Sequence, residues 1–190
     1  SILFMEIYLD NYFQNPIELM NRLFTYQREN KLMDKYPYTK NDLRKLALWM
    51  ATGSGKTLLM HINLWQIYRY NHGPNAINFD NIILITPNES LSEQHIEEMK
   101  KSGIIAKKYR GNSVGYFSVD DSKIVKVIEN TLLKEEKKGT GKTIDITEFG
   151  DRNLVLVDEG HKGQQSSKER VWVRNREFLA SKGFTVEYSA

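Results

Sequence analysis

The sequence has no cysteine, only four prolines and no long apolar run. Without cysteine, disulfide bonds, thiolate zinc sites and cysteine nucleophiles are all excluded. No stretch approaches the ~20 consecutive apolar residues that a membrane-spanning helix needs. The opening residues, SILFMEIYLD, also lack the basic flank and the small-residue cleavage site of a secretory signal. These absences predict a soluble, cytoplasmic protein with no membrane partner.

What is present suits a single globular domain. The chain has 190 residues, of which 40% are hydrophobic, and this is enough for one sizeable core. The formal net charge of +3 permits a nucleic-acid partner, but it is equally compatible with a solvated surface of mixed charge. The chain starts without methionine and stops at FTVEYSA, where the pattern still indicates a strand. We therefore expect a fragment of a longer protein.

Apolar runs alternate with helical patterns along most of the chain. Short runs rich in leucine, isoleucine and valine predict strands at 44–50, 81–87, 143–147, 153–160 and 183–190. Helical spacing of apolar residues predicts helices at 16–32, 57–70, 89–103, 121–139 and 169–180. This alternation indicates an α/β fold with a mainly parallel sheet and helices on both of its faces.

Two stretches, GSGKT at 53–57 and GTGKT at 139–143, could each end a phosphate-binding loop. Such a loop needs glycines, so that successive backbone N–H groups curl around phosphates, and it must open a helix whose positive end faces the same charge. The stretch at 53–57 lies between a predicted strand and a predicted helix, whereas the stretch at 139–143 has the reverse order. We therefore predict a turn at 139–143 and nucleotide binding by Thr52, Gly53, Ser54, Gly55, Lys56 and Thr57.

An acid at the end of a predicted strand supplies the second element that nucleotide hydrolysis requires. Hydrolysis needs magnesium, which prefers hard oxygen ligands, and a water oriented for attack. In LVLVDEGH, at 154–161, Asp158 lies at the carboxyl end of an apolar strand, where open parallel sheets bind ligands. We predict that Asp158 binds magnesium and that Glu159 acts as the general base. The alternative is that both acids simply begin a solvent-exposed loop.

Four segments, MATGSGKT, ITPNESLSEQH, LVLVDEGHKG and EYSA, resemble motifs I, Ia, II and the start of III of superfamily 2 helicases, in the same order. DEGHKG and FTVEYSA most resemble the restriction (Res) subunits of type III restriction enzymes and related DEAD/DEAH-box proteins. The similarity covers 44–190 and implies the first RecA-like lobe of a P-loop NTPase, preceded by a helical extension at 1–43. Met50 stands where the general phosphate-loop pattern has glycine, which weakens a match to kinases and small GTPases more than one to helicases.

The resemblance also implies cofactors and residue roles. ATP and Mg²⁺ are the expected cofactors. Lys56 is expected to bind phosphate and to be catalytic, Thr57 and Asp158 to hold the metal, and His161 to link the ATP state to nucleic-acid contacts. The expected activity is ATP hydrolysis to ADP and phosphate by a translocase or helicase, when a second lobe with an arginine finger is present. Without that lobe we expect weak nucleotide binding and poor hydrolysis.

Nucleic acid, in particular double-stranded DNA, is the partner that the resemblance implies, together with a modification or specificity subunit. Because it ends a strand and opens a helix, the loop TPN could contact a nucleic-acid phosphate through Thr86, Pro87 and Asn88. It could equally be a simple turn in which Ser90 or Ser92 caps the helix.

Two other functions fit the same motifs. A phosphotransferase such as a nucleotide kinase would use the loop on a small acceptor and would need an arginine-bearing lid, for which Arg170, Arg174 and Arg176 are available. It would yield a phosphorylated acceptor, whereas a motor releases inorganic phosphate. A non-catalytic interaction domain would have no need of the intact Lys56 and Asp158.

Overall fold

The computed structural model describes residues 1–32, 38–51, 53–111, 123–134, 143–158 and 167–189. Its centre is a six-stranded sheet in which every neighbouring pair of strands is parallel. The strands, in their order across the sheet, are β1 (Lys45–Trp49), β8 (Phe184–Ser189), β7 (Leu154–Asp158), β2 (Ile82–Thr86), β4 (Val125–Glu129) and β3 (Ala106–Lys108). Because all the strands run the same way, their carboxyl ends meet at one edge of the sheet.

Burial explains the composition of the strands. The central strands β2 and β7, IILIT and LVLVD, are buried along their whole length, which is why they are continuous apolar runs. The edge strand β1, KLALW, instead alternates between exposed and half-buried residues. Because β1 is also mostly apolar, an apolar run by itself does not distinguish an edge strand from a central strand.

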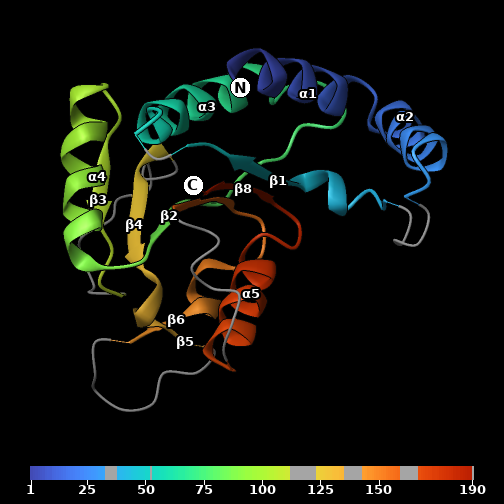
Figure 1. Cartoon of the computed structure of the whole chain (residues 1–190). Coiled ribbons are helices and arrows are strands. Elements are labelled where there is room, and N and C mark those ends of the chain that lie inside the picture. The colour runs from blue at the N-terminus through green and yellow to red at the C-terminus, as the bar shows by residue number, and fades with distance from the viewer. Residues whose placement is uncertain (33–37, 52, 112–122, 135–142, 159–166, 190) are drawn as a thin grey trace.

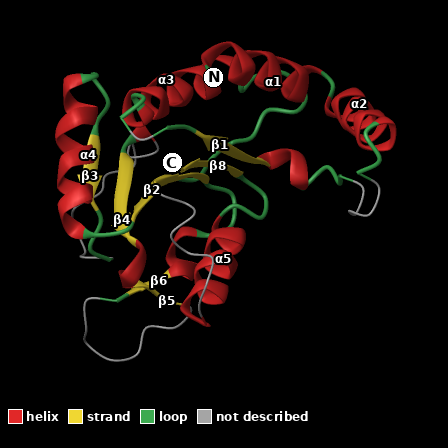
Figure 2. Ribbon diagram, in the orientation of Figure 1, coloured by secondary structure: helices red, strands yellow, loops and turns green. Residues whose placement is uncertain are grey.

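Helices cover both faces of the sheet (Figures 1 and 2). One face packs against α1 (Ile2–Gln14), α3 (Lys56–Tyr70) and α4 (Glu89–Lys101), and its core includes Ile82 and Leu84 of β2. The other face packs against α5 (Ser167–Leu179), the 3-10 helix η4 (Ile146–Phe149) and a two-stranded sheet of β5 (Leu133–Lys134) and β6 (Ile144–Asp145). Ile83 and Ile85 belong to that second core. The predicted α/β fold is confirmed.

Residues 1–29 form α1 and α2 (Pro16–Glu29). Helix α1 packs into the core on one face of the sheet through Met5, Leu9, Tyr12 and Phe13. The rings of Tyr12 and Phe184 lie 5.5 Å apart, edge to face. Thus part of the expected N-terminal extension shares the core of the lobe. The boundary at residue 43, next to the 3-10 helix η1 (Asp42–Arg44), stays a prediction.

The helix predicted at 121–139 is wrong. In its place the described residues form β4, the 3-10 helix η3 (Asn130–Leu132) and β5. Val125, Val127 and Ile128 are buried because β4 lies between β2 and β3 and is covered on both faces. An apolar run that is buried on both faces has no clear period, and β-branched residues favour the strand. The strand predicted at 143–147 is likewise shorter, since η4 begins at Ile146 with Asp145 as its cap.

The other predicted helices and strands agree with the structure to within a few residues at their ends. The turn predicted at 139–143 lies outside the described residues except for residue 143. None of the described helices is long and apolar enough to cross a membrane.

Candidate nucleotide site at the carboxyl edge of the sheet

The described part of the loop after β1 has glycines at positive φ, as a phosphate loop is expected to have. Gly53 and Gly55 adopt φ of +77° and +86°, in the left-handed region that favours glycine. Helix α3 starts immediately afterwards, at Lys56, with Gly55 as its N-cap residue. The first N–H groups of a helix have no partner within it, so this end of α3 is suited to bind an anion.

Lys56 and Asp158 meet at this edge of the sheet. Lys56 Nζ lies 3.6 Å from Asp158 Oδ1, although the two residues belong to elements that are far apart in the sequence. The strand order explains the contact, because only β8 separates β1 from β7. The structure therefore brings the ammonium group of the loop to the acid that ends the central strand.

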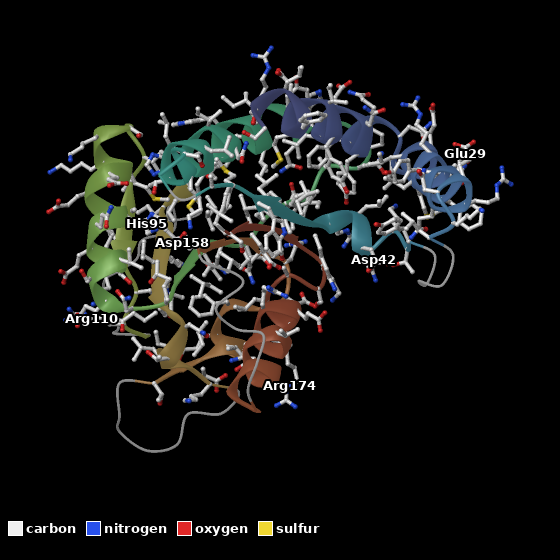
Figure 3. All side chains as sticks on the ribbon, viewed as in Figure 1. Glu29, Asp42, His95, Arg110, Asp158 and Arg174 are labelled. Carbon is white, nitrogen blue, oxygen red and sulfur yellow. The ribbon has the colours of Figure 1, made fainter. Side chains whose placement is uncertain are left out.

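A third side chain joins this pair. His95 Nε2, on α4, lies 3.0 Å from Asp158 Oδ2, and both residues are buried (Figure 3). An ionised carboxylate only accepts hydrogen bonds, so Nε2 carries the proton and donates it. The other ring nitrogen, Nδ1, is buried without a hydrogen-bond partner in the described part of the chain. Asp158 thus interacts with a different basic group at each of its oxygens.

These neighbours keep Asp158 ionised. Burial by itself raises the pKa of its carboxyl group, but the hydrogen bonds and charges of His95 and Lys56 outweigh that effect and hold the pKa below its ordinary value. At neutral pH the edge therefore presents a carboxylate beside an ammonium group and the positive end of a helix.

The family model described as "type III restriction enzyme, res subunit" matches residues 15–185. The chain belongs to this family. It is a helicase-type ATP-binding domain, and its fold is the RecA-like one that the resemblance implies. No curated protein matches the chain.

Several solved structures resemble this Res-family chain at low similarity. One is the arterivirus nonstructural protein 10 helicase in complex with DNA, at 16% identity and a TM-score of 0.42, with 79% of this chain and 30% of that chain covered. Another is S. cerevisiae Dbp5 bound to Nup159, Gle1, IP6 and ADP, at 17% identity and a TM-score of 0.45, with 100% of this chain and 46% of that chain covered. A third is the helicase domain of Pyrococcus furiosus Hef, at 17% identity and a TM-score of 0.45, with 85% of this chain and 34% of that chain covered. The chain spans less than half of each of these proteins, and the family assignment rests on the family model.

The donor groups at the edge fit a magnesium–nucleotide complex. Asp158 supplies a charged oxygen, and Thr57 is the second residue of α3, next to Lys56. Magnesium keeps several of its waters and commonly takes only one or two protein oxygens beside the substrate phosphates. Within the described ranges no group of three or more histidines or acids could hold a metal ion, and a site of this kind does not need one. Thr52, Glu159 and His161 lie outside the described residues.

The loop between β2 and α4 differs in one respect from the Res-type expectation. Thr86 is only 1% exposed, and its Oγ1 is 2.6 Å from Ser92 Oγ, so its side chain cannot reach a nucleic acid in this conformation. The helix cap is neither Ser90 nor Ser92 but Asn88, whose Oδ1 accepts a hydrogen bond from the Leu91 N–H at 3.0 Å. Of the expected backbone contacts, Pro87 and Asn88 remain accessible.

The arginines offered for a kinase lid are not all free. Arg176 Nη1 lies 2.6 Å from Glu187 Oε1 on β8, so it holds α5 against the sheet. Arg174 also has an interaction partner, and the side chain of Arg170 is outside the description. No observation favours the phosphotransferase alternative.

His95 ends the segment ITPNESLSEQH, which resembles motif Ia, but the resemblance gave it no role and it was not predicted as a site residue. A signal was nevertheless present in the sequence. His95 lies on the same face of α4 as Ser92 and Met99, the buried face of an amphipathic helix. A titratable residue on the buried face of a helix that starts at the ligand edge is a reason to look for a partner there.

Proposed function

We propose that this chain is the ATP-binding lobe of an ATP-dependent nucleic-acid translocase or helicase in a restriction-type DNA-processing system. The main support is the approach of Lys56 Nζ to Asp158 Oδ1, at 3.6 Å, beside the N-terminus of α3. Lysine and acid converge there on the space where a phosphate chain bound to the loop would end. Membership of the Res family supports the same function.

Each residue has a role in this proposal. The backbone of residues 52–55 and the first turn of α3 hold the phosphates, and Lys56 neutralises their charge. Thr57 and Asp158 would hold magnesium. The bound ion supplies positive charge that stabilises the transferring phosphoryl group. Glu159 orients and deprotonates the attacking water, and His161 links the nucleotide state to the nucleic acid.

The electrostatics of the described residues suit this role. Before nucleotide binds, Lys56 and Asp158 satisfy each other, so neither charge is left unpaired at a partly buried position. A negatively charged triphosphate can then draw the ammonium group towards itself, while Asp158 keeps the hydrogen bond from His95. The acid therefore stays ionised and is available to a cation.

Hydrolysis and movement require a second lobe in this proposal. An arginine finger contributes roughly 10³–10⁵-fold to the rate in related phosphoryl-transfer enzymes. The 190-residue chain should therefore bind nucleotide and release phosphate only slowly. Fast hydrolysis stimulated by nucleic acid from this chain alone would contradict the assignment as one lobe of two. Double-stranded DNA and a modification or specificity subunit are the partners we propose for the whole protein.

The experiment that tests the proposal measures binding of a fluorescent ATP analogue with Mg²⁺ to the chain. Lys56→Ala should weaken binding by about 10- to 100-fold, because a hydrogen bond to a charged group contributes roughly 1.5–3 kcal/mol. The control is Lys45→Ala at the other end of β1, where the lysine forms an exposed ion pair with Glu177. Equal affinity in wild type and Lys56→Ala would refute the site.

A further inference from the structure

The carboxylate of Asp158 is held on both sides by residues of two different helices. Lys56, the first residue of α3, approaches Oδ1, and His95, in the second turn of α4, bonds Oδ2. The lysine is partly exposed and its chain is flexible, whereas His95 is 3% exposed and fixed among buried side chains. In Figure 3 the labelled His95 and Asp158 lie together at the α4 side of the sheet.

We propose that His95 is a positioning residue for the metal-binding acid, an inference that rests on the proposed nucleotide site. By holding Oδ2 it fixes the rotation of the carboxyl group, so that Oδ1 stays directed towards Lys56 and the phosphate loop. A carboxylate that binds a metal needs such a partner, because rotation about its last bond otherwise moves the ligand oxygen away. When the ammonium group of Lys56 moves to the phosphates, His95 is the partner that remains.

The position of His95 gives this contact a structural advantage. Helix α4 is anchored at its start by the Asn88 cap and packs against β2, next to β7. The N–H donor of His95 therefore comes from a rigid helix and not from a loop. Strand β7, which carries Asp158, lies next to β2 in the sheet. A rigid donor defines the direction of the acid more narrowly than a solvent water would.

His61 provides a matched comparison within the same core. It is also a histidine, it is also 3% exposed, and it too has one buried ring nitrogen, Nε2, without a partner in the described part of the chain. Its Nδ1, however, bonds Ser102 Oγ at 2.8 Å, at the far end of α4. Replacing His61 therefore perturbs the α3–α4 packing to a similar extent but leaves the bond to Asp158 in place.

The test uses Mn²⁺ as the probe, titrated into the 190-residue chain with a non-hydrolysable ATP analogue. Free Mn²⁺ is followed by its electron paramagnetic resonance signal, and the same titration of the analogue without protein is subtracted, because the triphosphate binds Mn²⁺ by itself. His95→Leu keeps the volume of the side chain but removes the donor, and it should weaken Mn²⁺ binding by roughly 10- to 100-fold. His95→Gln, whose amide N–H can replace Nε2–H, should stay within about 3-fold of wild type. The Mn²⁺ affinity of His61→Leu should also stay within about 3-fold of wild type.

The outcomes separate the two proposals. Wild-type Mn²⁺ affinity in His95→Leu overturns the positioning role, and so does an equal loss in His61→Leu, which would assign the effect to packing. If either result is found while Lys56→Ala still weakens binding of the ATP analogue, the nucleotide site stands and only the positioning role is wrong. If wild type binds no Mn²⁺ with the analogue, both proposals are wrong. Thermal unfolding of each variant checks the fold, and His95→Ala takes the place of His95→Leu if that variant does not fold.

Discussion

The two edges of the sheet are built in opposite ways. At the amino edge, before β2, β7 and β8 begin, polar groups are paired with one another. Asn153 is fully buried there, and its side-chain amide donates to the carbonyl oxygens of Gly150 and Leu179, at 3.1 Å and 2.7 Å. Its own oxygen accepts a hydrogen bond from Asn81, at 2.8 Å. The charges around it form exposed pairs, Arg152 with Asp80 and Lys182 with Asp151.

At the carboxyl edge the interactions gather on one acid. Lys56 and His95 both approach Asp158, and the N-terminus of α3 lies beside them. The amino edge thus closes its hydrogen bonds within the fold, whereas the carboxyl edge holds charged groups and helix N–H groups that a ligand can take over. Stability is expected to depend mainly on the first edge and ligand binding on the second, as in other open parallel sheets.

Of the three substitutions predicted here, Gly183→Ala should lower the free energy of unfolding most, and it should not affect ligand binding. A methyl group at Gly183 would lie 1.9 Å from the backbone oxygen of Asn153, so the amino edge would have to move apart. We expect a loss of about 3 kcal/mol in the free energy of unfolding, measured by denaturant titration. Binding of the ATP analogue to the folded fraction should not change.

The neighbouring Lys182→Ala serves as the control for Gly183→Ala. It removes only an exposed ion pair with Asp151 and should cost less than about 1 kcal/mol. A Gly183→Ala variant that unfolds at the same denaturant concentration as wild type would contradict the close packing of this edge.

Asp158→Asn should have a smaller effect, which depends on pH. Because the folded state lowers the pKa of Asp158, its ionised form stabilises the fold. This contribution is fully present above the unfolded-state pKa of about 3.9 and is lost as the pH falls through the lower folded-state pKa. Wild type should therefore lose stability relative to Asp158→Asn below about pH 4. Urea titrations without metal or nucleotide measure the difference.

The stability difference between wild type and Asp158→Asn is the quantity to follow, since titrating groups that do not contact Asp158 contribute equally to both proteins. A difference that stays constant from about pH 7 to about pH 3 would show that the acid is not held ionised by its neighbours.

Asn88→Ala should have the smallest effect of the three. It removes the side-chain cap of α4 and should cost about 1 kcal/mol in the free energy of unfolding. Ser90→Ala, an exposed change in the first turn of the same helix, should cost much less. Equal losses in the two variants, measured by thermal unfolding, would mean that Asn88 is not the cap.

The sequence predicted well those elements whose signal is local. Buried strands such as IILIT and LVLVD are short apolar runs with clear ends, and the glycines at 53 and 55 mark a loop between a strand and a helix. Prediction failed where the pattern was ambiguous. The run around Val125 lacks a period. Within the helical extension predicted at 1–43 the bounds of α1 were not predicted, because apolar residues such as Phe4 are exposed on it while Met5 and Leu9 are buried.

The candidate site divides in the same way. The amino-acid sequence by itself determined that a lysine-bearing loop opens a helix and that an acid ends a buried strand, because each feature depends on a few consecutive residues. Only the tertiary structure decided that β8 lies between β1 and β7, that Lys56 thereby reaches Asp158, and that His95 of α4 bonds the other oxygen. Strand order and helix packing arise from contacts between residues remote in the chain, which no local pattern records.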